Sequence, residues 1–270
     1  MKTKLIAALI LSSLCCVRAT PINDPGDAAR IVAQIQRGDY EGNQGAMQKG
    51  YDDLKPFLDD KTISSRVRYW RGFAQWRRAI NGFNDKVDPK ELEQQLNTAL
   101  DEFKAALEID PKFVDAKAGT ISCTGFLFFV HKEDEAHRKE RRERILALLK
   151  EADEMDPDNP RLIWVHGPIY WNTTVEQGGG QDKMIQVFEQ AVQKCAYVSS
   201  PPDPLEPSWG KPELLMNLAY AHMNKKNPDP KAAEPYARSA LELVPYWHYV
   251  RDILLPQILA AKAKTAQSTP

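Results

Sequence analysis

The chain has 270 residues, of which 43% are apolar and 27% are charged, and its formal net charge is −1. This composition is that of a globular protein and is sufficient for one large domain or two small ones. The near-neutral charge excludes a general nucleic-acid binder, which carries a marked basic excess.

Residues 1–19 have the pattern of a signal peptide. Two lysines precede an apolar run from residue 5 to about 17, and Val17 and Ala19 stand at positions −3 and −1 of a cleavage site after Ala19. The run is too short for a spanning helix, which needs roughly 20 apolar residues. We therefore expect an exported protein, periplasmic or associated with the cell envelope, without an integral membrane segment after cleavage. Lipidation is disfavoured because no small residue precedes either cysteine of the run.

Removal of this leader would make the chain mildly acidic. It takes Lys2, Lys4 and Arg18 from the 36 basic residues and leaves 33 beside 37 acidic ones, a formal charge of −4. Two cysteines are left, Cys123 and Cys195. An oxidising compartment permits a disulfide between them, and two buried thiols acting as small apolar residues are the alternative.

Helical periodicity runs almost without a break from residue 27 to about residue 262. Short clusters rich in Pro, Gly, Asn and Asp interrupt it and divide the chain into ten or eleven helices. Strand-like alternation does not persist anywhere in the sequence. We expect one all-α domain over residues 20–263, followed by a polar, disordered tail over residues 264–270.

Three of these helices share one spacing of side chains ahead of a closing proline. The matching sets are Ala99, Phe103, Ala106 and Pro111, then Ile145, Leu149, Ala152 and Pro157, then Ala233, Ala237, Ala240 and Pro245. The segment "MIQVFEQAVQKC" carries a partial copy. Small side chains at fixed places allow close approach of a partner helix, so the sequence predicts repeated helix pairs in which Ala99, Ala106, Ala152 and Ala240 are buried at crossings.

The matching first helices precede these second helices. "VRYWRGFAQWRRA" contains Gly72 and Trp76, "PRLIWVHGPIYW" contains Gly167 and Tyr170, and "PELLMNLAYAHM" has small and apolar residues in equivalent places. Over roughly residues 66–256 the chain resembles the tetratricopeptide repeat family, with its pattern W-x2-L-G-x2-Y, then A-x3-F, then A and P. This resemblance implies an all-α, right-handed α-solenoid of four or five helix pairs.

A narrower resemblance rests on "YWRGFAQWRRAINGFN", "GGGQDKMIQVFEQAV" and "PSWGKPELLMNLAYAH". These segments are similar to those of a group of exported bacterial repeat proteins whose role is not established. In that group a Gly-Gly-Gly turn precedes a second helix and a Pro-x-Trp-Gly turn precedes a first helix. The resemblance implies a location and a shape, but no activity.

In a solenoid of helix pairs the first helices line a concave inner face, on which extended peptides bind. The register predicts that six side chains project from this face: Trp70, Arg77, Trp164, Trp171, Met216 and Tyr220. Aromatic and arginine side chains often dominate binding energy, although such aromatics also fill space between repeats. Trp70 and Arg77 together favour an acidic or carboxylate-terminated peptide. The alternative for Arg77 is an ion pair with an acidic residue of a neighbouring repeat.

The sequence contains no recognisable catalytic or metal-binding pattern. None of the five histidines forms HExxH, and no Cys/His pair has zinc-ligand spacing. The Gly178-Gly179-Gly180 turn lacks the lysine-serine/threonine ending of a phosphate-binding loop. We therefore predict a non-catalytic scaffold that docks a peptide or protein partner and uses no metal or cofactor. The alternative is a subunit of an envelope transport assembly that holds a small solute in its groove. The sequence leaves the oligomeric state open.

Overall fold

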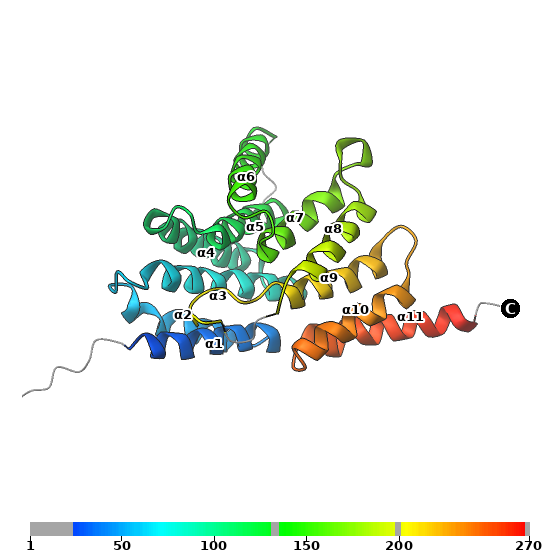
Figure 1. The fold of residues 1–270 in the computed structure, drawn as a ribbon, viewed down its shortest axis with the longest axis horizontal. Coiled ribbons are helices and arrows are strands. Elements are labelled where there is room, and N and C mark those ends of the chain that lie inside the picture. Colours follow the sequence, from blue (N-terminus) through cyan, green and yellow to red (C-terminus); the bar gives the residue numbers. More distant parts are fainter. Residues whose placement is uncertain (1–23, 131–134, 198–200, 268–270) are drawn as a thin grey trace, which may run out of the picture.

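A computed structural model of the chain describes residues 24–130, 135–197 and 201–267. These residues form eleven α-helices (Figure 1). The helices are α1 (Pro25–Glu41), α2 (Gln44–Asp53), α3 (Ser64–Asn84), α4 (Pro89–Ile109), α5 (Val114–Val130), α6 (Glu135–Met155), α7 (Pro160–Asn172), α8 (Gln181–Lys194), α9 (Lys211–Asn224), α10 (Pro230–Leu243) and α11 (Leu255–Gln267). Shorter helical turns are η1 (Lys55–Phe57), η2 (Val175–Gln177) and the π-helical η3 (Tyr249–Leu254). The predicted signal peptide lies outside the described residues.

Four of the helices begin with the same two-residue signal, a capping Asp or Asn followed by proline. The dipeptides are Asp24–Pro25, Asp88–Pro89, Asn159–Pro160 and Asp229–Pro230. In each, the capping side chain accepts a hydrogen bond from a backbone N–H of the first turn. Proline fits the first helical position because its missing N–H would have no partner there. The breaks read from the sequence are therefore helix starts as well as turns.

The helices pack as consecutive pairs. α3 packs against α4, α4 against α5, and α9 against α10, while α1, α3, α5, α7 and α9 also contact one another in that order. The last five are the first helices of the pairs, and they form the inner face of the array. The predicted all-α solenoid of helix pairs is confirmed. None of the helices in the described part of the chain is both long and apolar enough to cross a membrane.

The predicted close crossings are also present. Ala99, Ala106, Ala152 and Ala240 are each 0% exposed. These small side chains let the paired helices approach closely, as the recurring spacing required.

First-helix glycines complete the same crossings. A Cβ atom added to Gly72 would lie 2.8 Å from the ring of Phe103, and one added to Gly167 would lie 2.6 Å from the ring of Phe188. Any larger residue would collide with the bulky member of the second helix. The glycine of each first helix and the aromatic of its partner therefore form one packing unit.

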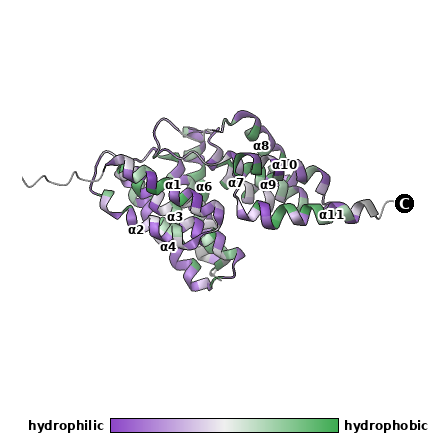
Figure 2. Cartoon of the chain, turned by 90° about the horizontal axis from the view of Figure 1, so that it is seen from below, coloured by the Kyte–Doolittle hydropathy of each residue, from purple (hydrophilic) through white to green (hydrophobic). Residues whose placement is uncertain are grey.

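The C-terminal end differs from the sequence prediction. Residues 264–267, which we expected to be part of a disordered tail, belong to α11, and residues 268–270 lie outside the described part. Apolar residues recur along α11 (Figure 2). Its Ile258 is fully buried and belongs to the same core cluster as the alanines of α10. Lys262 forms an ion pair of 2.6 Å with Glu234 of α10. These contacts with α10 hold α11 in place, and the helix continues beyond them through polar residues.

Candidate functional site

An irregular, proline-rich segment covers the inner face of α3. Residues 201–210, here called the connecting segment, lead into α9 and pass in front of α3 (Figure 1). The indole Nε1 of Trp70 donates to the Leu205 carbonyl at 2.7 Å, and Arg66 pairs with Glu206 at 2.7 Å. Leu205 is only 3% exposed. Residues 205–210 of the connecting segment thus pack against the hydrophobic core, while residues 202–204 are exposed.

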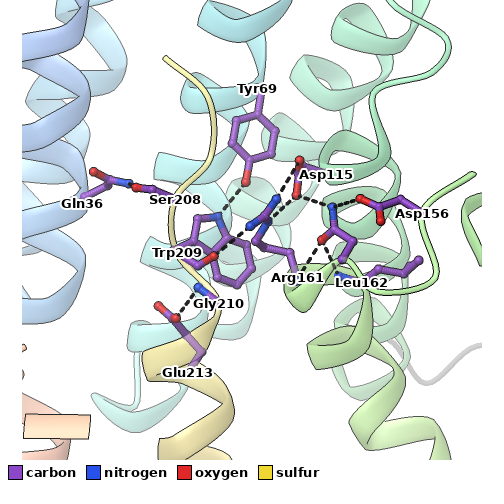
Figure 3. A network of polar contacts seen from close by, with 11 residues as sticks. Gln36, Tyr69, Asp115, Asp156, Arg161, Leu162, Ser208, Trp209, Gly210 and Glu213 are labelled. Atoms are coloured by element: carbon purple, nitrogen blue, oxygen red, sulfur yellow. Dashed lines mark hydrogen bonds and ion pairs between the residues drawn. The ribbon is translucent and has the colours of Figure 1, made fainter. Parts of the chain in front are cut away.

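Trp209 anchors the connecting segment. Its ring centroid lies within 6 Å of those of Phe73, Trp76 and Trp164, at 5.7, 5.6 and 5.9 Å. Its indole Nε1 donates to the Tyr69 hydroxyl at 2.8 Å (Figure 3). Because the only polar atom of this side chain is satisfied, a tryptophan can be buried here at little cost.

A buried ion pair fixes the end of the connecting segment (Figure 3). Arg161 of α7 donates through Nε to Asp115 Oδ1 at 2.5 Å and through Nη1 to the Trp209 carbonyl at 3.2 Å. The chain then turns at Gly210, whose φ of 131° and close approach to Pro160 both require glycine. The turn allows α9 to start directly after the segment.

A second buried network joins both ends of the array. Arg77 of α3 pairs with Asp39 of α1 at 2.8 Å, and Tyr40 of α1 donates to Glu213 of α9 at 2.7 Å. Glu213 also accepts from the backbone N–H of Gly210 at 2.7 Å. Burial raises the pKa of both Glu213 and Tyr40. The C-terminal end of α1 therefore contacts the start of α9 through buried side chains.

The structure corrects the role predicted for Trp70 and Arg77. Trp70 is 0% exposed and lies under the connecting segment, and the side chain of Arg77 is 5% exposed and paired with Asp39. Neither is accessible to a partner in this structure. Other parts of the chain cover both side chains. For Arg77, the alternative of an ion pair with a neighbouring repeat is the one observed.

The other four predicted residues lie toward the C-terminal half. Trp164 is partly buried, and its ring lies 5.8 Å from that of Trp76, so it belongs mainly to the core around Trp209. Trp171 packs on the core between α8 and α9, and Met216 packs on the core between α9 and α10. Both are partly accessible, and Tyr220 is 44% exposed. The accessible part of the predicted surface is therefore Trp171, Met216 and Tyr220.

Sequence reasoning missed the side chains that cover the inner face, Leu205 and Trp209. It interpreted the Pro-x-Trp-Gly stretch only as a turn before a first helix. The available signal was composition, because a tryptophan and a leucine in a proline-rich connection are unfavourable to leave in water. It also missed a polar groove beside α3, which is described below.

The described residues also contain a smaller groove and two free thiols. A groove of about 290 Å³ includes His166, which is 2.9 Å from Asp153 and stacks on Tyr170. Cys123 is buried and Cys195 half-buried, and neither forms a disulfide; burial raises the pKa of both thiols. In the part of the chain that the structure covers, no three His, Cys, Asp or Glu side chains gather in a way that could hold a metal ion.

Comparison with known proteins supports the fold. No family model matches the sequence, and no curated protein is similar to it. The structure resembles the crystal structure of TTC0263, a thermophilic TPR protein of Thermus thermophilus, with a TM-score of 0.57 and 17% sequence identity. The match covers 89% of this chain and 100% of the other. With its consecutive helix pairs, the chain has the fold of a tetratricopeptide-repeat-like, right-handed α-solenoid.

Proposed function

We propose that this chain is a non-catalytic scaffold that docks a peptide or protein partner on the accessible part of its inner face. Support comes from what the inner face of α3 already holds. The irregular, proline-rich connecting segment lies there, and its Leu205 carbonyl accepts a hydrogen bond from Trp70 of α3. Its Trp209 carbonyl accepts one from Arg161 of the neighbouring first helix α7. An inner face that binds a segment of its own chain through carbonyl oxygens and an aromatic anchor has suitable chemistry for a partner segment.

The partner surface in this proposal is formed by Trp171, Met216 and Tyr220. Tyrosine, tryptophan and methionine are enriched at protein–protein interfaces. Their side chains offer a large contact area and contain few polar groups that need a hydrogen-bond partner. Met216 and Tyr220 are four residues apart on α9 and so lie on one side of that helix. The connecting segment leaves this side partly accessible, unlike the side of α3 that carries Trp70.

Export belongs to the same proposal. The leader-like residues 1–19 support an exported protein, periplasmic or associated with the envelope. Intact-mass measurement of the protein purified from its native cells tests this point, and the expected chain starts after Ala19. A mass that includes Met1, or one that fits a lipidated Cys15 or Cys16, contradicts export by this route.

Docking is tested with variants of the two accessible α9 side chains. Protein carrying both Met216→Ser and Tyr220→Ser is used beside the unmodified chain to capture partners from envelope extract. The expected result is loss of specific bands with the double variant. Val175→Ser serves as the control, because Val175 is 76% exposed but belongs to the turn between α7 and α8. Equal capture by all three proteins contradicts the proposed surface.

The solute-holding alternative has less support. Polar side chains form most of the lining of the two grooves that we describe, of about 290 and 760 Å³. A groove that encloses a small solute for transport typically has mainly apolar walls with a few polar groups. At the inner face, no observation on the described residues favours this alternative over docking.

A further inference from the structure

A polar groove of about 760 Å³ lies between the second helices α2 and α4, over α3. Its lining includes four glutamines, Gln48, Gln75, Gln94 and Gln95, together with Tyr51 and Arg78. At 100° per residue, Gln75 projects about 140° from Trp70 and about 160° from Phe73, the two side chains that face the connecting segment, and Arg78 projects about 80° and about 140° from them. Neither Trp70 nor Phe73 lines the groove. The groove is therefore separate from the inner face.

Arg78 is held in this groove by neutral groups. Its Nη1 donates to the side-chain oxygens of Gln48 and Gln75. Its Nε is buried and has no hydrogen-bond partner. Glu91 Oε1 lies 3.9 Å from Nη2, which is beyond hydrogen-bonding distance. The glutamines thus orient the guanidinium without neutralising it, and its Nε–Nη2 edge forms no hydrogen bond.

Other arginines of the chain use this same edge to hold a carboxylate. Arg161 donates from Nε to Asp115 Oδ1 at 2.5 Å and from Nη2 to Asp115 Oδ2 at 3.4 Å. Arg251 contacts both oxygens of Asp252 in this way, each at 2.8 Å. The two N–H groups of the edge are parallel and match the spacing of carboxylate oxygens.

Arg78 also differs from the other shielded arginines of α3. Arg66, Arg71 and Arg77 each pair with a carboxylate at 3.0 Å or less. Arg78 has a side-chain exposure of 16% but no carboxylate at that distance. Burial lowers its pKa, and the charges of Glu91 and Asp52 do not compensate fully. A bound anion would supply the missing negative charge.

Gln95 adds an acceptor to the lining of the same groove. It is 5% exposed, and its Nε2 donates to Glu91 Oε1 at 3.0 Å, the same oxygen that lies 3.9 Å from Arg78. This bond fixes the orientation of the amide, so Oε1 of Gln95 points away from Glu91. That oxygen is buried and has no hydrogen-bond partner. The lining of the groove therefore includes a cationic donor edge and an amide acceptor, both without a hydrogen-bond partner.

We propose that this groove binds an α-carboxylate with an N–H group on the same carbon, as found in a free amino acid and at a peptide C-terminus. The carboxylate takes the Nε–Nη2 edge of Arg78, and the adjoining N–H donates to Gln95 Oε1. Inorganic anions lack the N–H group, and amidated peptides lack the carboxylate. This site is independent of the docking proposed for the inner face, and either can fail alone.

Titration calorimetry on the purified protein tests the site with four probes. These are N-acetyl-trialanine with a free carboxylate, the same peptide with a terminal amide, free alanine and inorganic phosphate. We expect the free acid to bind at least about 10-fold more tightly than the amide or phosphate. A tripeptide that binds about 10-fold more tightly than alanine supports a peptide terminus as the natural ligand, and equal binding supports a free amino acid.

Variants connect the binding to the two named residues. Arg78→Gln should weaken binding of the free acid by about 10-fold or more, and Gln95→Met by about 3-fold. The control is Arg238→Gln, because Glu234 already occupies the same edge of that arginine on α10. It should bind like the unmodified protein.

Three results on the unmodified protein would overturn the proposal. They are equal binding of acid and amide, phosphate binding as tight as that of the acid, and no binding of either carboxylate up to about 20 mM. Unchanged binding by Arg78→Gln would also overturn it. If that variant does not fold, the comparison of acid and amide on the unmodified protein decides the question.

Discussion

The two halves of the inner face use the same helix-pair architecture for different purposes. In the N-terminal half, α3 presents Tyr69, Trp70, Phe73 and Trp76, and all four are buried, beneath the connecting segment or in the core beside it. In the C-terminal half, Tyr220 of α9 stays 44% exposed. The difference teaches that the repeat pattern determines how helices pair, but not whether the face they form is available to a partner.

The composition of the two first helices explains this difference. Four large aromatic rings on one stripe of α3 expose a hydrophobic area that water solvates poorly, and each such ring buries about 150–250 Å². The connecting segment removes this area from water by adding Leu205 and Trp209. On α9 the corresponding stripe is less apolar, because Met216 and Tyr220 stand beside Asn217. It can remain partly exposed.

The strongest test of the comparison removes the anchor of the covered half. Trp209→Ala should lower the free energy of unfolding by about 3–5 kcal/mol, because it leaves a cavity among three aromatic rings and removes the bond to Tyr69. Denaturant titration followed by circular dichroism measures this loss. Val175→Ala, at an exposed position, is the control and should change little. A loss below about 1 kcal/mol for Trp209→Ala would mean that the segment covers α3 without stabilising it.

The sequence predicted the helix pairs because their determinants are local. Gly72 and Phe103, or Gly167 and Phe188, lie within one repeat, and their spacing can be read directly. The cover of Trp70 is not local, since Leu205 is 135 residues away along the chain. No repeat spacing indicates which loop returns to which helix.

The identity of the charged partners was also beyond sequence reasoning. Arg77 pairs with Asp39, one of 37 acidic residues in the chain, and no motif singles out that one. Arg78 and the glutamines around it look like an ordinary solvated helix face in the sequence. Only the structure shows that neutral acceptors hold this arginine where its neighbours have carboxylates.

A second test asks whether the first and second helices of a pair pack in the same way in both halves. Gly72→Ala and Gly167→Ala each introduce a Cβ within 3 Å of a buried phenylalanine ring, so each should cost about 1–3 kcal/mol. Gly125→Ala in α5 is the matched control, because its Cβ would meet nothing within 4 Å. It should leave stability unchanged or raise it by up to about 1 kcal/mol. A tolerated alanine at only one of the first two sites would show that the halves do not share one packing rule.

A third test addresses the contact between the two halves, where Glu213 of α9 accepts a hydrogen bond from Tyr40 of α1. Burial raises the pKa of Glu213 above 4.5, so the folded state holds this proton more tightly than the unfolded state. Its contribution to stability is complete below about pH 4.5 and is lost as pH rises through the higher folded pKa. Relative to Glu213→Gln, the unmodified protein should therefore lose stability over that range, by at most about 1.4 kcal/mol per pH unit.

Glu234 provides a control for this pH series, because its pKa is shifted in the opposite direction. Its pKa is lowered by hydrogen bonds from Lys262 and Arg238 on the surface of α10 and α11. Its contribution is therefore present above its unfolded pKa and lost as pH falls. If the free energy of unfolding changes with pH in the same way for the unmodified protein and for Glu213→Gln, a raised pKa of Glu213 is contradicted.

The smallest change in stability is expected at Tyr220, the most exposed residue of the proposed docking surface. Tyr220→Ser removes a ring that is 44% exposed, so the free energy of unfolding should change by no more than about 0.5 kcal/mol. The same variant should weaken partner capture, because the ring would form part of the docking surface. Denaturant titration and capture from envelope extract measure the two effects on one preparation. A stability loss above about 2 kcal/mol would mean that Tyr220 is a core residue like Trp70, and the two halves of the inner face would then be alike. Unchanged stability with unchanged capture would leave the halves distinct in exposure and remove Tyr220 from the docking surface.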